Sequence, residues 1–233
     1  MSLAYTLGSS ADWFLSTATR PNSPFPQDPR LVCPEVEYTT SSVDSLIDPL
    51  IRPALGYMRG YALLLNDGVQ RGSPRRTESE YQKFIFSLHY RLVWLQGVFF
   101  DDAISECLRL TMLALLTTTL QIPGARATYP DLASRLREQY YGVLADHQCA
   151  SLEQRDEFLL WSLLAGAVSV FDVGELSRDG HWMRDLWEMS SGRLDCSWEE
   201  MRLILGKYVW INGLHDGAGS HAFEFLANGS SNE

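Results

Sequence analysis

The densest group of side chains that could do chemistry lies in the segment His215-Asp216-Gly217-Ala218-Gly219-Ser220-His221-Ala222-Phe223-Glu224. Histidines and carboxylates of this kind can supply a general base, the acid that orients it, or ligands for a metal. Gly217 and Gly219 would permit a close turn between them. The structural alternative is helix capping around a surface turn, because neighbours such as His215 and Asp216 point their side chains in different directions.

A second chemical candidate is the acidic stretch Asp101-Asp102-x-x-x-Glu106. Carboxylates one helical turn apart can share a magnesium ion, and the stretch superficially resembles the aspartate-rich segment with which terpene cyclases hold magnesium and a diphosphate. That chemistry needs a second acidic metal box, and the cluster at His215 has the wrong spacing for one. We therefore expect no metal site, and favour a helix N-cap with acids that complement the helix dipole.

The chain lacks the sequence motifs of the commonest hydrolases, NTPases, dehydrogenases and zinc proteases, which are G-x-S-x-G, the Walker loop, the dinucleotide-binding glycine fingerprint and H-E-x-x-H. Isomerases and cyclases that use no cofactor remain open, because they need only a shaped cavity with an acid, a base and excluded water. If the chain is an enzyme, we expect it to use no cofactor and to carry its catalytic groups on His215, Asp216, His89 and Asp102.

Aromatic residues and one arginine form the candidate ligand-binding set, which is Tyr90, Trp94, Arg109, Trp161, Trp182 and Trp210. Aromatic walls with a few polar groups suit a planar or polycyclic metabolite, but a large helical domain also uses such residues as core. Arg109 lies in an apolar stretch, so it should pair with a carboxylate such as Glu106 one turn earlier, or else recognise an anion. His89 and Tyr90 can line a cavity or pack as an ordinary amphipathic helix.

The composition limits the partners that these residues can serve. With 233 residues, of which 45% are apolar, the chain can bury a substantial core as a single unit. Its net charge of −10 repels phosphate backbones, so we expect no direct contact with nucleic acid. The apolar stretches 108–120 and 158–171 are shorter than the ~18–20 residues of a membrane span, so we expect buried helices and no membrane association.

The four cysteines indicate a reducing compartment. They stand at positions 33, 107, 149 and 196 and form no C-x-x-C pair. Scattered cysteines on apolar helical stretches are typical of free thiols, so we expect a location in the nucleus or the cytoplasm. The first residues also lack the basic start and the apolar run of a secretory signal, and we therefore expect a protein that is not secreted.

Helix-start signatures predict the elements that position the candidate residues. Three have the spacing of a capping box: Thr77-Glu78-Ser79-Glu80, Ser151-Leu152-Glu153-Gln154 and Ser197-Trp198-Glu199-Glu200. In addition, Asp101-Asp102 can cap a helix from Ala103 to about Leu120, and Pro130 suits the first turn of one that continues to about Ala145. Strand signals are nearly absent. The sequence thus predicts a single all-α domain of about seven to nine helices.

Proline usage divides the chain. Residues 1–41 contain five of the ten prolines, which fix φ and remove backbone donors, so we expect an irregular N-terminal arm packed on the domain. Trp13, Phe14 and Phe25 would be its anchors. The helical domain is expected over 42–227, followed by a tail at 228–233. Its first helical stretch should be divided by Pro49 and Pro53 and should end at Asn66-Asp67-Gly68.

Three further segments carry a family resemblance. They are 100–116, where an acidic start leads into an Arg-Leu and an aliphatic run; 158–167, with Leu-Leu-Trp before small residues; and 198–219, with Tyr208-Val209-Trp210-Ile211 and Leu214-His215-Asp216. In order and spacing, over roughly residues 85–220, they resemble the regulatory domain of fungal binuclear-zinc-cluster transcription factors. The resemblance implies a helical domain that tunes activation, often in secondary-metabolite or nutrient pathways. The six closely spaced cysteines of the zinc cluster are missing from this sequence.

Two functions stay open at this point. One is a regulatory or ligand-binding domain without a DNA-binding module, linked to a secondary-metabolite pathway, whose partner is a protein, a second copy of the chain, or a small hydrophobic or aromatic metabolite. The other is a cofactor-free isomerase, cyclase or dehydratase that acts on a polyketide or terpenoid intermediate. An enclosed cavity lined by His89, Trp161 or His215 would favour a ligand or a substrate.

Overall fold

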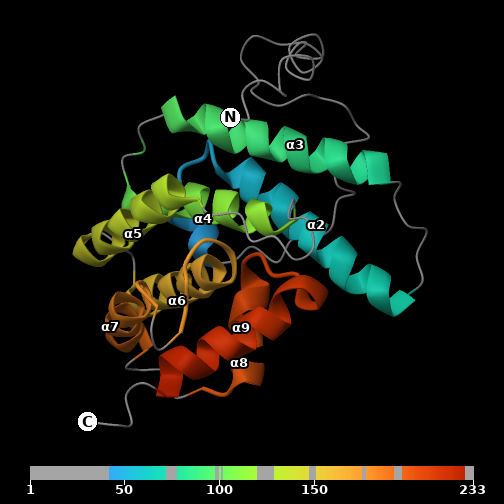
Figure 1. Cartoon of the computed structure of the whole chain (residues 1–233). Coiled ribbons are helices and arrows are strands. Elements are labelled where there is room, and N and C mark those ends of the chain that lie inside the picture. Colours follow the sequence, from blue (N-terminus) through green and yellow to red (C-terminus); the bar gives the residue numbers. More distant parts are fainter. Residues whose placement is uncertain are drawn as a thin grey trace.

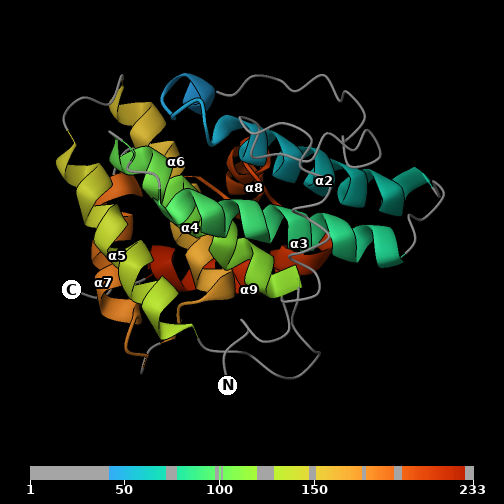
Figure 2. The same ribbon diagram turned by 90° about the horizontal axis from the view of Figure 1, so that it is seen from above.

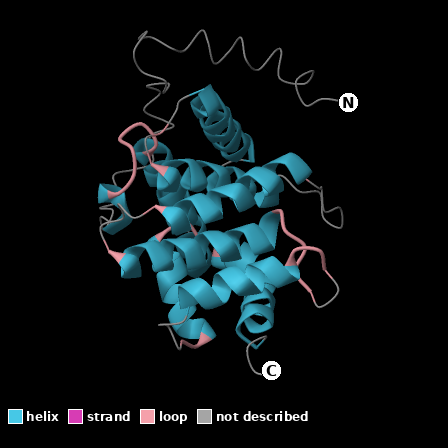
Figure 3. Ribbon diagram, turned by 90° about the vertical axis from the view of Figure 1, so that its left-hand side faces the viewer, coloured by secondary structure: helices cyan, strands magenta, loops and turns pink. Residues whose placement is uncertain are grey.

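The computed structural model describes residues 42–71, 78–97, 100, 102–119, 129–146, 151–174, 177–191 and 196–228. These ranges fold into helices without a β-strand, which confirms the predicted all-α class (Figure 1; Figure 3). The eight α-helices of this part of the chain are α2 (Arg52–Arg71), α3 (Glu78–Trp94), α4 (Ala103–Thr119), α5 (Pro130–Ala145), α6 (Leu152–Ser169), α7 (Gly180–Ser191), α8 (Trp198–Lys207) and α9 (Asn212–Ala227). Two short 3-10 helices, η2 (Ser42–Ser45) and η3 (Leu95–Gly97), precede α2 and follow α3.

Side-chain caps start two of the helices as predicted. The Ser197 hydroxyl accepts from the Glu200 N–H, and the Glu200 carboxylate accepts from the Ser197 N–H, so α8 begins with a complete capping box. The Ser151 hydroxyl accepts from the Gln154 N–H at the start of α6. These caps satisfy N–H groups that have no partner within the helix. The predicted box at Thr77 lies outside the described residues.

Two other predicted starts are confirmed at α4 and α5. Asp102 accepts from the backbone N–H of Ser105 at 2.6 Å, directly before α4. Pro130 is the first residue of α5. The expected division near Pro49 and Pro53 is also present, because these prolines lie between η2 and α2 and in the first turn of α2, where the missing N–H costs nothing.

The predicted end of the first long helix at Asn66-Asp67-Gly68 is wrong, because α2 continues to Arg71. Asn66 Nδ2 donates to the Trp210 carbonyl at 2.9 Å, and Asn66 Oδ1 accepts from the Asn212 N–H at 2.9 Å. The amide is therefore engaged by a distant segment and does not compete with its own backbone, which is how asparagine usually ends a helix. The same two bonds tie α2 to the segment that precedes α9 and to the first residue of α9.

The predicted turn at Gly217 and Gly219 is also wrong, because both glycines lie inside α9. A Cβ at Gly219 would lie 2.6 Å from the ring of Trp210, so this glycine serves close packing. The buried side of α9 follows helical spacing and consists of His215, Gly219, Ala222, Phe223 and Leu226. Small and polar residues on its other side concealed this period in the sequence.

The core is built around α4 and α6. Thirteen of the 17 residues of α4 are buried, because α3, α5 and α6 pack around it, and α6 in turn packs against α7, α8 and α9. Figure 2 shows α3 passing across α4 at the outside of the bundle. One hydrophobic cluster includes buried residues from Ile47 to Leu226. The prediction that stretches 108–120 and 158–171 are buried helices is thus confirmed by the described residues of α4 and α6.

Two further findings concern membrane spans and cysteines in the part of the chain that the structure describes. None of its helices combines the length and the apolar character that a membrane span requires. Cys107 and Cys196 are free thiols. Cys33 and Cys149, the predicted arm at 1–41 and residues 229–233 lie outside the described ranges.

Candidate functional site

His215 is buried near the start of α9 and uses both ring nitrogens in hydrogen bonds. Nδ1 accepts from the Ile211 N–H at 3.2 Å, so Nε2 carries the ring proton. Nε2 then donates to Thr118 Oγ1 at 3.0 Å, and the Thr118 hydroxyl donates to the Leu115 carbonyl at 2.7 Å. Burial lowers the pKa of His215 to about 4. The neutral imidazole therefore bridges α9 and α4, and neither nitrogen is left to act as a base.

Asp216 does not orient the His215 ring. Its Oδ1 accepts from Trp210 Nε1 at 2.8 Å, and its Oδ2 forms an ion pair with Arg202 Nη2 at 2.9 Å. The two neighbours therefore bond in different directions, as expected for adjacent residues. Asp216 fixes the Trp210 ring against α8 and α9.

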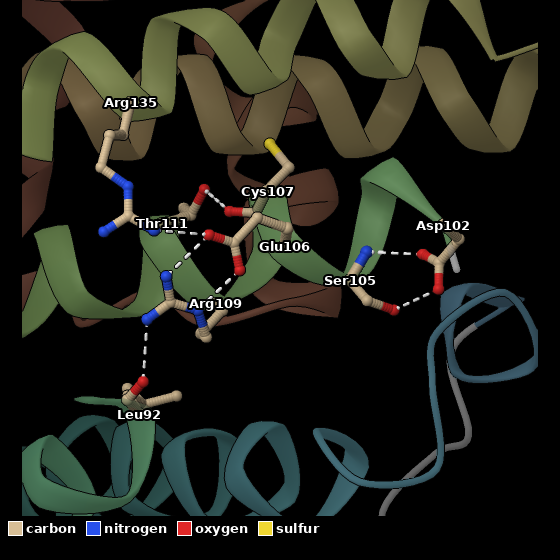
Figure 4. A network of polar contacts seen from close by, with 8 residues as sticks. All are labelled: Leu92, Asp102, Ser105, Glu106, Cys107, Arg109, Thr111 and Arg135. Atoms are coloured by element: carbon tan, nitrogen blue, oxygen red, sulfur yellow. Dashed lines mark hydrogen bonds and ion pairs between the residues drawn. The ribbon is translucent and has the colours of Figure 1, made fainter. Parts of the chain in front are cut away.

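Asp102 caps α4, as Figure 4 shows. One carboxylate oxygen accepts from the Ser105 N–H at 2.6 Å, and the other accepts from the Ser105 hydroxyl at 2.7 Å. The Ser105 oxygen also accepts from the Asp48 N–H at 2.8 Å, which ties the segment after η2 to α4. Asp102 lies before α4 and His215 contacts the other end, at Thr118, so about 24 Å of helix separates these two candidate catalytic groups.

His89 lies on α3, which packs against α2 and α4. Partial burial lowers its pKa, and its buried Nδ1 has no hydrogen-bond partner. It belongs to neither of the groups around His215 and Asp102. The four candidate catalytic residues thus occupy several separate places in the fold, and they do not converge on one reacting atom.

Arg109 forms the ion pair that the sequence predicts. Its guanidinium is fully buried and donates to both oxygens of Glu106 at 2.7 Å through Nε and Nη2 (Figure 4). Nη1 donates to the Leu92 carbonyl at 2.8 Å, and Arg135 on α5 contacts the same Glu106 at 3.0 Å. This bidentate arrangement joins α3, α4 and α5. The guanidinium is therefore used in helix packing, which leaves no free edge for an anion.

Three of the candidate tryptophans are core residues. Trp161, Trp182 and Trp210 are 0–6% exposed. Each indole N–H has an acceptor: the Val209 carbonyl at 3.0 Å for Trp161, Asp179 at 3.1 Å for Trp182 and Asp216 at 2.8 Å for Trp210. The Trp161 ring also stacks on Tyr208, with ring centres 4.9 Å apart. These buried rings pack against other aromatic side chains, as is usual in a protein core.

A buried hydroxyl and thiol cluster between α4, α5 and α6 was not predicted. Tyr140 donates to the Ser162 carbonyl at 2.8 Å, Thr111 contacts Ser162 Oγ, and Cys107 Sγ lies 3.7 Å from that oxygen. Burial raises the pKa of Cys107 to about 12, so the sulfur stays a thiol and is a poor nucleophile. The polar residues come from three helices, and no sequence spacing links them.

One small pocket lies between α2 and α3. It is lined by Tyr57, Phe84, Ser87, Leu88 and Arg91, and its volume of about 10 Å³ has room for roughly one water molecule. The Arg91 guanidinium lies 5.1 Å from the centre of the Tyr57 ring, and burial lowers the Arg91 pKa to about 10. None of the residues that the sequence analysis proposed for an enclosed cavity, His89, Trp161 or His215, lines this pocket.

Tyr90 and Trp94 differ from the other ligand-binding candidates because they lie on the surface. With Phe86 and Val93 they form an apolar row on the outer side of α3, which we call the α3 stripe. The exposed fractions are 43% for Phe86, 40% for Tyr90, 44% for Val93 and 50% for Trp94. Their spacing of i, i+4, i+7 and i+8 places them on one helix face. Sequence reasoning missed Phe86 and Val93, although this spacing could have revealed them.

The opposite face of α3 is buried and belongs to the core. It carries Phe84, Ile85, Leu88 and Leu92, all at most 5% exposed. Helix α3 is therefore apolar on two sides, and one of them packs against the described helices α2 and α4. An outward apolar row of this kind on a peripheral helix is typical of an interaction surface.

A search for metal-ligand groups and comparisons with known proteins complete the description of the candidate site. Among the described residues, no three His, Cys, Asp or Glu side chains are grouped so that they could hold a metal ion. Searches against protein-family models, curated proteins and solved structures found no match to the chain.

Proposed function

We propose that the chain is a regulatory interaction domain, similar to that of fungal binuclear-zinc-cluster transcription factors, and that it acts through a protein contact on the α3 stripe. The observation that supports this proposal is the exposure of four large apolar side chains on one face of α3. A helix packed on one side normally presents polar residues to solvent on the other. Binding of a partner removes such an apolar row from water, which is the usual driving force of a protein contact.

The contacts of the candidate catalytic residues weigh against the enzyme alternative. An isomerase or cyclase needs an acid and a base that reach one substrate. His215 and Asp216 instead bond to Thr118, Trp210 and Arg202, and Asp102 bonds to the first turn of α4. Each of these groups has a structural task that its catalytic use would interrupt.

The charge of the chain indicates the chemistry of the partner. The net charge of −10 favours a protein segment that carries lysine or arginine beside its apolar residues. Apolar side chains of that segment would pack between Phe86, Tyr90 and Trp94, as an amphipathic helix does in a hydrophobic groove. We infer that the partner belongs to the transcription machinery of a secondary-metabolite pathway, as the family resemblance implies.

Replacement of the gene in its host tests this function. Three strains are compared with wild type: a deletion, a Phe86→Glu/Trp94→Glu double variant, and Leu203→Glu, a matched charge on the outer side of α8, where Leu203 is 73% exposed. We expect the double variant to change pathway transcripts as the deletion does, because charges on the stripe oppose apolar docking. The Leu203 variant should behave as wild type.

Circular dichroism of the purified variants shows whether the helical fold is retained. Transcripts that stay at the wild-type level both in the deletion and in the folded double variant would exclude the proposed function. Pathway intermediates that accumulate unchanged while transcripts stay normal would instead support the enzyme alternative.

A further inference from the structure

The outer side of α3 carries one lysine in line with the apolar residues of the α3 stripe. Lys83 is exposed and stands three residues before Phe86, and Tyr90 and Val93 follow at spacings of four and three. Spacings of three and four alternate between the a and d positions of a coiled coil, where the residues of one helix pack against a second helix. Lys83 thus occupies an a position at the beginning of this row.

We propose that the α3 stripe binds a single amphipathic helix of another protein in the manner of a coiled coil, and that Lys83 sets the register of this helix by pairing with one of its acidic residues. The inference rests on the proposed function, because it names the shape and the charge of the segment that the stripe binds. A lysine at a single a position fixes the register of a coiled coil, since only one alignment gives it a partner.

The charge beside the stripe is opposite in sign to that of the whole chain. Residues 81–100 contain no aspartate or glutamate although the chain has 29 acidic residues, and both Lys83 and Arg91 lie in this stretch. The net charge of −10 acts on a partner at long range and favours lysine and arginine on the side that faces away from the contact. At the contact itself, salt limits the interaction to about 8 Å, so the local cation selects an acidic side chain.

The size of the stripe fits a short helix and is too small for a stable contact between two copies of the chain. With about 200 Å² for a whole aromatic side chain, the exposed parts of its four apolar residues amount to roughly 350 Å². Two stripes would therefore bury roughly 700 Å² in total, below the 1,200 Å² or so of a stable interface. Parallel pairing of two copies would also set Lys83 against the same lysine of the other copy. A helix of about twelve residues covers the row from Lys83 to Trp94.

The position of α3 leaves this side accessible. The opposite side of α3 packs against α2 and α4, and Figure 2 shows α3 at the outside of the bundle. In the part of the chain that the structure describes, no helix covers the row, since the four apolar side chains are 40–50% exposed. Helices that pack with this spacing cross at about 20° with their axes 8–10 Å apart, so the partner helix contacts the whole row.

Selection from a peptide library by the purified full-length chain tests the proposal. The probe is a display library of peptides about three heptads long, in which the a and d positions are randomised. The other positions are fixed as helix-forming residues without net charge. We expect the enriched peptides to have apolar residues at consecutive a and d positions and one aspartate or glutamate at a constant distance from them.

Reversal of charge identifies the residue that this acidic group contacts. Lys83→Glu should weaken the binding of an enriched peptide about tenfold, because like charges then face each other in the contact. Lysine in place of the acidic residue of the peptide should restore binding to this variant. Arg178→Glu makes the same change at an arginine before α7 whose side chain is 82% exposed, and it should leave binding unchanged. Circular dichroism of each variant shows whether the helical fold is retained.

The other outcomes separate this inference from the proposed function. An affinity that Lys83→Glu leaves unchanged while Phe86→Glu abolishes it, or enriched peptides without a constant acidic position, would overturn the role of Lys83 but keep the stripe as a contact surface. A library without binders, or binding that survives Phe86→Glu, would overturn the helical occupant. Light scattering that shows dimers of the chain, dissociated by Phe86→Glu, would overturn it in favour of a second copy. The transcript test in the host uses none of these peptides, so either test can fail alone.

Discussion

Several buried polar side chains of this protein bond to backbone groups in or next to the helices and so help to fix the helices in place. Arg109 donates to the Leu92 carbonyl, Trp161 donates to the Val209 carbonyl, and His215 accepts from the Ile211 N–H. A buried side chain that forms such a hydrogen bond is held in place, and its polar atoms are then not available to bind or protonate a substrate. At the scale of single residues, chemical type suggested a catalytic role for His215 and ligand-binding roles for Arg109 and Trp161, whereas in the structure each of these side chains is engaged in hydrogen bonds within the fold.

His215 should make stability depend on pH. Its pKa is about 4 in the folded chain and near its ordinary value of 6.5 in the unfolded chain, so only the unfolded chain binds the proton between these values. Acidification from pH 6.5 towards pH 4 therefore favours unfolding, and the contribution is roughly 3 kcal/mol. Urea unfolding measured across this range should show a smaller loss of stability in His215→Gln than in the wild type.

The exposed His181 on α7 offers a matched control, because His181→Gln removes an imidazole that makes no such bridge. The lowered pKa of His89 acts in the same direction, so some pH dependence should persist in His215→Gln. Equal losses of stability in wild type and His215→Gln would contradict the assigned role of this residue.

At the scale of elements, close approach between helices depends on where glycine stands. In α9, a Cβ at Gly219 would lie 2.6 Å from Trp210 and 3.0 Å from Trp198, whereas a Cβ at Gly217 would meet nothing within 4 Å. The two glycines therefore affect the stability of the fold differently. Gly219 allows α9 to pack on the two indole rings, whereas Gly217 makes no such contact and only lowers the helix propensity of α9.

Alanine at these two positions should shift stability in opposite directions. Gly219→Ala should destabilise the fold by roughly 1–3 kcal/mol through overpacking against Trp210. Gly217→Ala should stabilise it by about 0.5–1 kcal/mol, because alanine is the better helix former. Thermal unfolding of the two variants measures both effects. Two changes of the same sign would show that α9 does not pack on Trp210 as described.

Predictions from the sequence were correct where the signal for a helix start lies within a few neighbouring residues. The caps at Ser197 and Ser151 are short-range hydrogen bonds, and their residue types identify them. Sequence reasoning failed at Asn66, because the partners that decide its role, Trp210 and Asn212, are distant in the sequence. It failed at Gly219, because the close approach of Trp210 depends on how the chain folds between α8 and α9 and not on a local residue pattern. Tyr90 and Trp94 were named as candidate binding residues, but helical period alone could not say which apolar side of α3 faces the core.

At the scale of the whole molecule, contacts between distant segments join the ends of the described chain. Asn66 of α2 bonds to the Trp210 carbonyl and the Asn212 N–H, and Asp48 bonds to Ser105 at the start of α4. Buried residues from Ile47 to Leu226 also belong to one hydrophobic cluster. We therefore expect the early and late helices to unfold together.

Asn66→Ala tests this cooperativity. The variant leaves one carbonyl and one N–H without their partner, so it should lose about 1–3 kcal/mol. Because the links are shared, the urea midpoints from tryptophan fluorescence and from far-UV circular dichroism should move together. Asn228→Ala, at an exposed position after α9, should change stability by no more than about 0.5 kcal/mol. Two separate transitions in either protein would show that the helices form independent units.

The burial of α4 sets how the molecule opens. Helix α4 is enclosed by α3, α5 and α6, so its backbone amides meet deuterated solvent only when the surrounding helices have separated. Hydrogen-exchange protection factors of the amides in Leu110–Leu115 should therefore report the free energy of global unfolding. Amides of the peripheral helix α3 can also exchange through local unfolding, which costs less free energy. A ligand or partner on α3 would then slow isotope exchange locally without altering the slowest protons of the protein.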